Sequence, residues 1–363
     1  PLWQVADLTL PKIHGEKGMK KTNTGKVSIR DVAKEVGVSI TTVSRALNGY
    51  SDVSEKTKEK IFEAVERLDY APDANARSMG GKAEINIALL TSELKERDEN
   101  GFVYSFINGL YQQCTVLGCE FMLLVTDAVK QEKLSFLQMC KKKNLSGIVV
   151  TGLRTDDPYY KEVMESRIPC ALIDMKVTGK HKCGITIDNV QASREAVEYL
   201  IRLGHRNIGM MNGQKMSDVS GERYGGYVAA LLGAKISLRL DYMRYGDFVE
   251  ETAYEQTKDL MKQHPEITAL FCASDVMAIG AVRALEEMGK KVPEDMSVIG
   301  FDDIPIAKYV YKGITTVRQF PIEMGRTGGE AVWKMLNGEA VEHEIFLPYE
   351  LVIRETTAER KKN

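Results

Sequence analysis

Residues 28–49, SIRDVAKEVGVSITTVSRALNG, constrain the fold most, because they predict two short amphipathic helices joined by a tight turn. Ser28 followed by Asp31 has the spacing of a capping box at the start of the first helix. Gly37 ends that helix, since glycine adopts the left-handed conformation without the strain that a side chain brings. Ser39 is then placed to cap the second helix.

The apolar positions of both helices fall on one side. They are Ile29, Val32, Ala33, Val36, Val43, Ala46 and Leu47. The second helix exposes small polar residues, one isoleucine and one arginine on its outer face. Those residues are Ile40, Thr41, Thr42, Ser44 and Arg45. Such a face is suited to the major groove of DNA. A helical hairpin inside a larger core is the alternative, which the polar face and the surrounding positive charge disfavour.

Basic charge is concentrated around this stretch. Residues 19–47 carry six lysines and arginines against two acidic side chains, although the 363-residue chain has a net charge of −2. The rest of the chain must therefore be acidic, which fits a polyanionic partner at one end only. A third amphipathic helix, capped by Ser54, is predicted within residues 52–70 and completes a three-helix headpiece.

The sequence shows no membrane span and no targeting segment. No stretch approaches the ~18 unbroken apolar residues of a membrane helix, and residues 1–18 lack the pattern of a signal peptide. Residues 1–26 are interpreted as an extension or disordered arm. The six cysteines form no C-x-x-C pair, so we expect buried free thiols in a reducing cytoplasm, with no metal and no cofactor.

After residue 82 the pattern changes to apolar strand-like runs that alternate with amphipathic helical stretches. The predicted strands are residues 85–92, 119–126, 147–152, 169–174, 207–212, 268–273 and 296–303. The predicted helices are residues 103–117, 131–142, 158–166, 190–203, 221–232, 250–263 and 276–288. This alternation predicts doubly wound parallel sheets in two similar lobes, because roughly 280 residues exceed one sheet. A ligand should then bind between the lobes, at the carboxyl ends of the strands.

The segment 71–82 joins the headpiece to this α/β body. Pro72 prevents the third helix from continuing, and Gly80-Gly81 allows only about six helical residues, fewer than a helix that is stable alone in water. Local physics therefore favours a plain linker, with a helix that forms only against a partner as the alternative.

Motifs along most of the chain resemble the lactose-repressor (LacI/GalR) family of bacterial transcription regulators. These motifs are DVAKEVGVSITTVSRALNG, VSEKTKEKIFEAVERLDYAP, ANARSM, YLIRLGHRNIGMM, ERYGGY, CASDVMAIGAVRAL, VPEDMSVIGFDDI, TTVRQFPIEMG and LVIRET. The resemblance implies a helix-turn-helix headpiece followed by a body like the type I periplasmic binding proteins. The expected parts are a headpiece (27–70), a hinge (71–82), an N-lobe (83–187 with 319–341), a C-lobe (188–318 with 342–357) and a tail (358–363).

The resemblance also implies which residues contact operator DNA. Ile40, Thr41 and Arg45 match base-reading positions, and arginine can donate two hydrogen bonds to guanine. Thr42 and Asn48 match positions that contact phosphates. Met79 takes the place of the leucine that the family inserts into the minor groove from a hinge that becomes helical on DNA. The full predicted set is Ser39, Ile40, Thr41, Thr42, Ser44, Arg45, Asn48, Asn75, Arg77 and Met79.

For the effector, the resemblance implies ligand contacts from the ends of several strands. The predicted effector-binding residues are Phe102, Asp174, Arg223, Ser274 and Asp302. An arginine beside carboxylates suits a polyhydroxylated neutral ligand, most simply a sugar. A structural ion pair is the alternative for Arg223 with Asp302. Asp275 and Asp188 are expected to be helix caps rather than ligand contacts.

These observations predict a cytoplasmic regulator, a repressor rather than an activator, that binds pseudo-palindromic operator DNA and releases it when an effector binds. The resemblance implies a homodimer, with a dimer of dimers as a variant. Two further readings stay open. One is a solute-binding protein without a DNA role, and the other is a regulator that responds to a nucleobase or a phosphorylated protein. No catalytic motif supports an enzyme.

Overall fold

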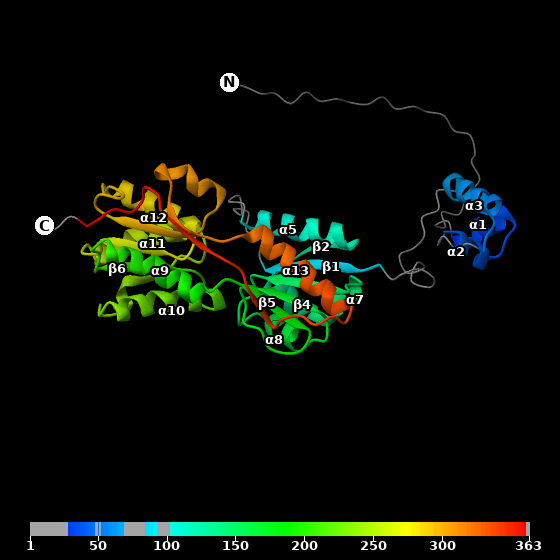
Figure 1. The fold of residues 1–363 in the computed structure, drawn as a ribbon, viewed down its shortest axis with the longest axis horizontal. Helices are drawn as coiled ribbons and strands as arrows, with labels where there is room; N and C mark the ends of the chain where they lie inside the picture. The colour runs from blue at the N-terminus through cyan, green and yellow to red at the C-terminus, as the bar shows by residue number, and fades with distance from the viewer. Residues whose placement is uncertain (1–27, 48–49, 51, 69–83, 93–101, 361–363) are drawn as a thin grey trace, which may run out of the picture. The chain divides into compact units, whose positions relative to one another are not determined.

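A computed structural model describes residues 28–47, 50, 52–68, 84–92 and 102–360. The chain divides into two compact units, residues 1–83 and residues 84–363. The first unit holds the helical headpiece, and the second holds the α/β body (Figure 1).

The headpiece is a three-helix unit whose ends are fixed by local hydrogen bonds. Its helices are α1 (Ile29–Val36), α2 (Ile40–Leu47) and α3 (Glu55–Arg67). The backbone N–H and the hydroxyl of Ser28 both donate to the Asp31 carboxylate, at 2.8 and 2.7 Å. Gly37 has a φ of 73°, and the Thr42 N–H donates to Ser39 Oγ at 3.0 Å. The predicted helices and starting residues are confirmed.

The headpiece core contains the predicted apolar positions. Val32, Ala33, Val43 and Ala46 are buried, and Ile29, Val36 and Leu47 are partly buried against them. Val53, Ile61 and Ala64 complete the buried set. An ion pair between Arg67 and Glu35, at 2.9 Å, links α3 to α1 across the outside. Because α2 packs into this core through Val43 and Ala46, its outer face is left for contacts outside the headpiece.

The N-lobe is a parallel sheet with strand order β11-β5-β4-β3-β1-β2. Alternate strand residues face two different cores. Leu89 and Val149 pack towards α5 and α13, whereas Leu90 and Val150 pack towards α7 and α8. The N-lobe elements are β1 (Asn86–Ser92), α5 (Phe102–Leu117), β2 (Glu120–Thr126), α6 (Ala128–Lys133), α7 (Phe136–Lys142), β3 (Gly147–Thr151), α8 (Pro158–Glu165), β4 (Cys170–Ile173), β5 (Lys182–Thr186), α13 (Pro321–Leu336) and β11 (Glu344–Phe346).

The C-lobe repeats this plan with strand order β12-β10-β9-β8-β6-β7, in which only β12 runs antiparallel to its neighbour. Helices α9 and α10 lie on one face of its sheet, and α11 and α12 lie on the other (Figure 1). The C-lobe elements are α9 (Asn189–Arg202), β6 (Ile208–Asn212), α10 (Asp218–Gly233), η2 (Leu240–Tyr242), β7 (Met243–Tyr245), α11 (Glu250–Gln263), β8 (Ala269–Cys272), α12 (Asp275–Glu287), β9 (Ser297–Asp302), η3 (Pro305–Lys308), η4 (Val310–Lys312), β10 (Thr315–Arg318) and β12 (Glu350–Val352).

The return of the chain to the N-lobe depends on a close helix contact. A Cβ on Gly109 of α5 would lie 2.0 Å from the carbonyl oxygen of Ile322, and one on Gly325 of α13 would lie 2.3 Å from that of Phe106. Only glycine permits α13 to approach α5 this closely. Helix α13 therefore packs on the N-lobe although it follows the last parallel C-lobe strand.

Two expectations about the body are wrong. Residues 342–346 were expected in the C-lobe. Residues 344–346 instead form β11, which pairs with β5 in the N-lobe sheet, with Glu344 opposite Gly184. The single helix expected over residues 131–142 is two helices. Ser135 accepts a hydrogen bond from the Gln138 N–H at 3.3 Å and so starts a new helix after α6.

Candidate DNA-binding and effector sites

The outer face of α2 carries the predicted DNA-contacting residues of the headpiece. Ile40 is 44% exposed. Ser39 and Thr41 are also exposed, and Thr42 and Ser44 are half-buried. The Ser39 hydroxyl is engaged by the Thr42 N–H, so its main structural role is to start the helix.

Arg45 is held by neighbours within the headpiece. Its Nε and Nη2 contact the two carboxylate oxygens of Asp52 at 3.1 and 2.7 Å, and its guanidinium carbon lies 4.6 Å from the centre of the Tyr50 ring. Both members of the ion pair are about half exposed, and exposed pairs of this kind contribute ~0–1 kcal/mol. Asp52 therefore orients Arg45 without preventing an exchange of partners on DNA.

The remaining predicted DNA contacts lie outside the described residues. These are Asn48, Asn75, Arg77 and Met79. The hinge prediction for residues 71–82 therefore stays a prediction.

In the body, a chain of hydrogen bonds runs from the N-lobe into the C-lobe. Asp174 follows β4 with a φ of 52°, and its Oδ1 accepts a hydrogen bond from the Thr186 hydroxyl at 2.7 Å. The Asn189 side-chain N–H donates to the same hydroxyl at 3.0 Å. Since Asn189 begins α9, this contact carries the chain into the C-lobe.

Arg223 is the next member of the chain and is 3% exposed. Its Nε donates to Asn189 Oδ1 at 3.0 Å, and its Nη1 donates to the Ala273 carbonyl at 2.6 Å. The Phe301 ring packs against the guanidinium, with its centre 3.7 Å from the guanidinium carbon. These contacts fix the arginine in a single orientation at the carboxyl end of the C-lobe sheet.

Asp302 completes the chain at the end of β9. Its Oδ1 lies 3.7 Å from Arg223 Nη1 and accepts a hydrogen bond from Gln319 Nε2 at 2.7 Å. Burial raises the pKa of Asp302 to about 7, and Asp174 adds to this effect, whereas Arg223 and Gln319 oppose it. Among the described residues, Gln319 Oε1 is buried without a hydrogen-bond partner. We call Asp174, Thr186, Asn189, Arg223, Asp302 and Gln319 the ligand network.

Two of the five predicted effector residues do not join this network through any contact among the described residues. Phe102 is the first residue of α5 and packs, half-buried, against the main core. Ser274 is the N-cap of α12, and its Oγ accepts a hydrogen bond from the Met277 N–H at 3.2 Å. Ser274 does follow Ala273, whose carbonyl binds Arg223.

One of the two expected helix caps is wrong. Asp188 caps α9 as predicted, by accepting from the Gln191 N–H at 2.8 Å. Asp275 is not a cap, because Ser274 fills that position. Asp275 is fully buried and accepts from the Ile304 N–H at 2.9 Å and the Thr316 hydroxyl at 2.5 Å.

The start of α10 connects the lobes beside the network. Asp218 Oδ2 accepts from the Tyr160 hydroxyl at 2.7 Å and from the Lys176 N–H at 3.1 Å. One turn later in α10, the Glu222 carboxylate accepts no hydrogen bond from a described residue. Burial raises the pKa of Glu222 to about 7, with further contributions from Asp174 and Asp218, opposed by Lys176 and Arg223.

The network offers many acceptors and one fixed guanidinium, which suits a ligand with several hydroxyl or N–H donors. Sequence reasoning missed Thr186, Asn189, Glu222 and Gln319. Asn189 and Thr186 carried a weak signal, since they flank the predicted cap Asp188. Glu222 and Gln319 lie within the motifs ERYGGY and TTVRQFPIEMG that carry the family resemblance, but neither stands out by residue type.

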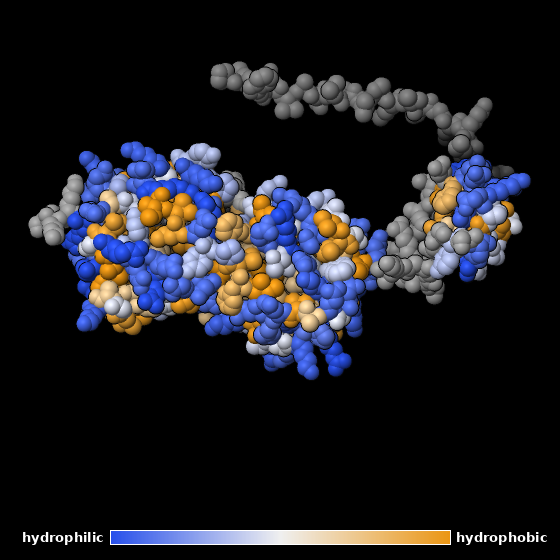
Figure 2. Space-filling model, viewed as in Figure 1, coloured by the Kyte–Doolittle hydropathy of each residue, from blue (hydrophilic) through white to orange (hydrophobic). Residues whose placement is uncertain are grey.

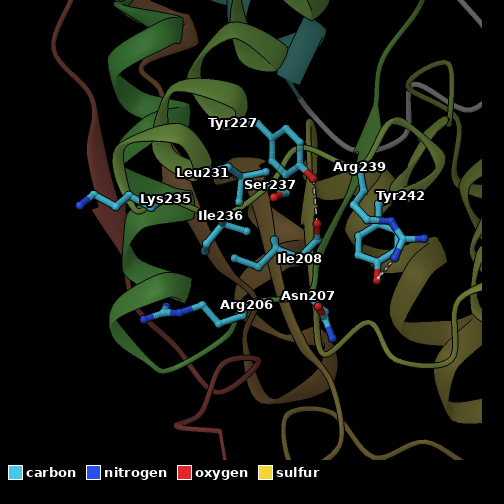
Figure 3. A pocket seen from close by; sticks show the side chains of 10 residues that line it. All are labelled: Arg206, Asn207, Ile208, Tyr227, Leu231, Lys235, Ile236, Ser237, Arg239 and Tyr242. Carbon is cyan, nitrogen blue, oxygen red and sulfur yellow. Dashed lines mark hydrogen bonds between the residues drawn. The ribbon is translucent and has the colours of Figure 1, made fainter.

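The cavity in Figure 3 lies elsewhere. It has a volume of about 320 Å³ and surrounds Ile208, the first residue of β6 and thus the opposite end of the strand from the network. Arg206 and Lys235 point away from its centre (Figure 3). Arg239, on its other side, is paired with Asp241 at 2.6 Å. None of the charged side chains that line the cavity is therefore both unpaired and directed into it.

The expectation for the cysteines is confirmed. All six cysteines are buried free thiols. Among the residues that the structure describes, no group of histidine, cysteine or acidic side chains is arranged to hold a metal ion. Within the same residues, no helix combines the length and apolar character needed to cross a bilayer.

Comparison with protein families gives two matches on the same chain. Residues 28–73 match the family described as bacterial regulatory proteins, lacI family, and residues 197–357 match the periplasmic binding protein-like domain. A repressor from Erwinia tasmaniensis, the HTH-type transcriptional repressor PurR, is 31% identical over 328 residues, which cover 90% of this chain and 95% of that protein. Catabolite control protein A from Priestia megaterium is 28% identical and covers 91% of this chain and 99% of its own length.

Solved structures give the same result. The lac repressor dimer bound to operator and the anti-inducer ONPF is 28% identical, has a TM-score of 0.78, and covers 92% of this chain and 100% of its own. The complex of the transcriptional regulator CelR with cellobiose is also 28% identical, with a TM-score of 0.70 and coverage of 91% and 99%.

Proposed function

The chain belongs to the lacI family of bacterial regulatory proteins, and we propose that it is a cytoplasmic homodimeric repressor whose operator affinity is controlled by a sugar-like ligand at the ligand network. Its relatives are DNA-binding transcriptional regulators. The proposal adds the class of effector, the residues that bind it, the dimeric state and the direction of control. It includes no catalysed reaction.

One observation carries the proposal. Three residues singled out from the sequence as effector contacts, Asp174, Arg223 and Asp302, belong to one chain of hydrogen bonds and a final ion pair that passes from the N-lobe to the C-lobe. A ligand that bonds to both ends of this chain necessarily responds to the relative position of the lobes. Such a ligand and the operator are then coupled reciprocally.

The effector class follows from the donors and acceptors. Carboxylate oxygens of Asp174 and Asp302 and the unpartnered Gln319 Oε1 can accept from hydroxyl groups. Phosphate is disfavoured, because a phosphorylated ligand would meet these acceptors and Glu222 with only Arg223 as a buried cation. The cellobiose complex of the relative CelR supports a carbohydrate.

An apolar surface on the N-lobe supports a homodimer. Hydrophobic residues lie at the surface where α5 and β2 lie in the body (Figure 2). Tyr104 and Val116 of α5 are 70% and 78% exposed, and Val125 at the sheet edge is 41% exposed. Clustered exposed apolar side chains are typical of protein interfaces. A second copy is the natural occupant, because the operator-bound relative is a dimer.

The test of the effector site is a calorimetric titration of the full chain with sugars and nucleobases, after a thermal-shift screen. We expect a sugar to bind, and Arg223→Ala to weaken that binding at least 30-fold, since truncating a buried charged donor costs about 2–5 kcal/mol. Operator affinity without ligand should be kept.

The control for this experiment is Arg239→Ala, which removes an arginine at the cavity of Figure 3. It should leave sugar binding unchanged. Binding of a nucleobase instead of a sugar contradicts the effector class, and an unchanged titration of Arg223→Ala contradicts the site.

The headpiece has its own test. Arg45→Ala should broaden the set of sequences selected from a random DNA library, because a bidentate contact to guanine contributes about 1–3 kcal/mol of discrimination. Non-specific affinity should persist. Asp52→Ala removes the partner that orients Arg45 and should broaden selection less. Equal loss of affinity on every sequence contradicts the base-reading role.

A further inference from the structure

A second charged surface lies at the amino ends of three N-lobe strands, whereas the ligand network lies at their carboxyl ends. Of three consecutive lysines before β3, two end α7 and the third is its C-cap, and single basic residues precede β4 and β5. All are exposed, and none forms an ion pair with a described residue. We call this surface the basic edge, which consists of Lys141, Lys142, Lys143, Arg167 and Lys180.

The strand register brings these residues to one side of the sheet. The Cys170 N–H in β4 donates to the His181 carbonyl at 3.0 Å, so the segments that lead into β4 and β5 run side by side. A groove of about 570 Å³ lies between these two segments, with Arg167 and Lys180 in its lining. The groove is therefore open to a ligand at least as large as a phosphate group.

A buried cation adds to the positive charge at this edge. Lys182 is 4% exposed, and its Nζ donates to the carbonyl oxygens of Ser166 and Ile168 at 2.8 and 2.9 Å. Burial lowers the pKa of Lys182. Its hydrogen-bond partners are neutral carbonyls, so they do not cancel its charge. Acidic Glu84 and Glu120 lie at the starts of β1 and β2, so the basic edge is limited to β3, β4 and β5. Glu165 also lines the groove, but it is paired with Lys161 at 3.6 Å.

The chain itself indicates the partner. It enters the body at β1, where the Asn86 side chain donates to the Asn144 carbonyl at 3.0 Å. Lys143 is therefore next to the point where the headpiece is attached. Residues 69–83 link that point to the headpiece, and a chain of this length spans at most ~50 Å. DNA held by the headpiece extends as a rod with one negative charge per ~1.7 Å of axis.

We propose that the basic edge binds the phosphate backbone of DNA that flanks the operator, so that the body adds a sequence-independent contact to the contacts of the headpiece. This inference rests on the DNA binding of the family and goes beyond it, since it gives the body a direct contact with DNA. It is independent of the effector class.

The experiment measures binding of the full chain to a random-sequence duplex of about 60 base pairs and to one of about 20 base pairs, which is two helical turns, at several salt concentrations. The variant is Lys141→Gln, Lys142→Gln and Lys143→Gln together. The matched control replaces three exposed C-lobe lysines, Lys262, Lys291 and Lys308, by glutamine and so makes the same change in net charge.

On the long duplex, the slope of log affinity against log salt should fall by about 0.9 for each phosphate contact that the variant loses. The control should keep the wild-type slope. On the short duplex, the variant and the control should behave alike. A variant slope equal to that of the control on the long duplex overturns the proposal, and so does an equal loss on both duplexes.

Discussion

The two lobes are built on similar sheets, but their facing edges differ. At the carboxyl edge of the C-lobe sheet, Asp275 is fully buried and joins the loop after β9 to β10 through Ile304 and Thr316. At the carboxyl edge of the N-lobe sheet, the bridge between β4 and β5 is the hydrogen bond from Thr186 to Asp174, which remains partly exposed.

This difference assigns separate tasks to the lobes. Polar groups that are already fixed lose little freedom when a ligand binds to them. Arg223, with its fixed guanidinium, belongs to the C-lobe, so the C-lobe is the preorganised half of the site. The N-lobe contributes groups whose position depends on how the lobes meet. The lobe contacts at Asp218 are then the place where ligand binding and lobe position are linked.

The largest expected effect tests the rigidity of the C-lobe edge. Asp275→Ala leaves a buried N–H and a buried hydroxyl without their acceptor, which costs about 3 kcal/mol or more in the free energy of unfolding. Asp174→Ala should cost about 1 kcal/mol, because its carboxylate is partly hydrated. Urea unfolding of both variants measures the contrast.

Asp188→Ala is the control for this pair. It removes a helix cap in the same region and should cost about 1 kcal/mol. Equal losses for Asp275→Ala and Asp174→Ala would show that the two edges are equally rigid, and the division of tasks between the lobes would then be wrong.

A smaller effect is expected from the contact between the lobes. Tyr160→Phe removes the hydroxyl that donates to Asp218 across the lobes, a hydrogen bond that contributes about 1 kcal/mol. Ligand affinity should therefore fall about fivefold in a calorimetric titration, since the closed arrangement loses stability. The preorganised C-lobe contacts should be unaffected.

The neighbouring tyrosine provides a matched control. Tyr159 lies on the same helix, and its hydroxyl donates to the Leu134 carbonyl within the N-lobe. Tyr159→Phe should lower the thermal stability of the chain but leave ligand affinity unchanged. An equal loss of affinity in the two variants would mean that N-lobe stability, rather than the contact between lobes, controls binding.

Local patterns made much of the fold predictable. Caps such as Ser28, Ser39 and Asp188 act within three or four residues, so the sequence contains the whole interaction. Long apolar runs likewise identified the central strands. Strand β5, KCGIT, was missed although it is fully buried, because it contains Lys182, whose charge is accommodated by carbonyls that only the fold brings near.

The candidate site was predictable in part. Asp174 and Asp302 end apolar runs and could be placed at strand ends. Gln319 and Asn189 could not, because their partners lie 17 and 34 residues away in the chain. Asp275 looked like a cap by position, and its burial against Thr316 depends on a strand 41 residues later.

The last expected effect depends on pH and concerns Glu222, which lies near Asp174 and Asp218 where the lobes meet. Because its pKa is raised from 4.5 to about 7 in the folded chain, its contribution to stability is complete below pH 4.5 and is lost as the pH rises through 7. Glu222→Gln keeps the shape of the side chain but cannot ionise, so the variant does not lose this stability at high pH. The variant should therefore match the wild type at pH 4.5 and be more stable at pH 8, by less than about 3 kcal/mol.

Thermal unfolding at both pH values measures this difference. Asp302 titrates in the same range and direction, so only the difference between the variant and the wild type isolates Glu222. Exposed Glu255 on α11 gives the control, and Glu255→Gln should follow the wild-type curve. If Glu222→Gln also follows that curve, Glu222 is hydrated in the folded chain. The lobe boundary would then be open to water beside the network, and the N-lobe edge would be looser than its contacts with Asp218 indicate.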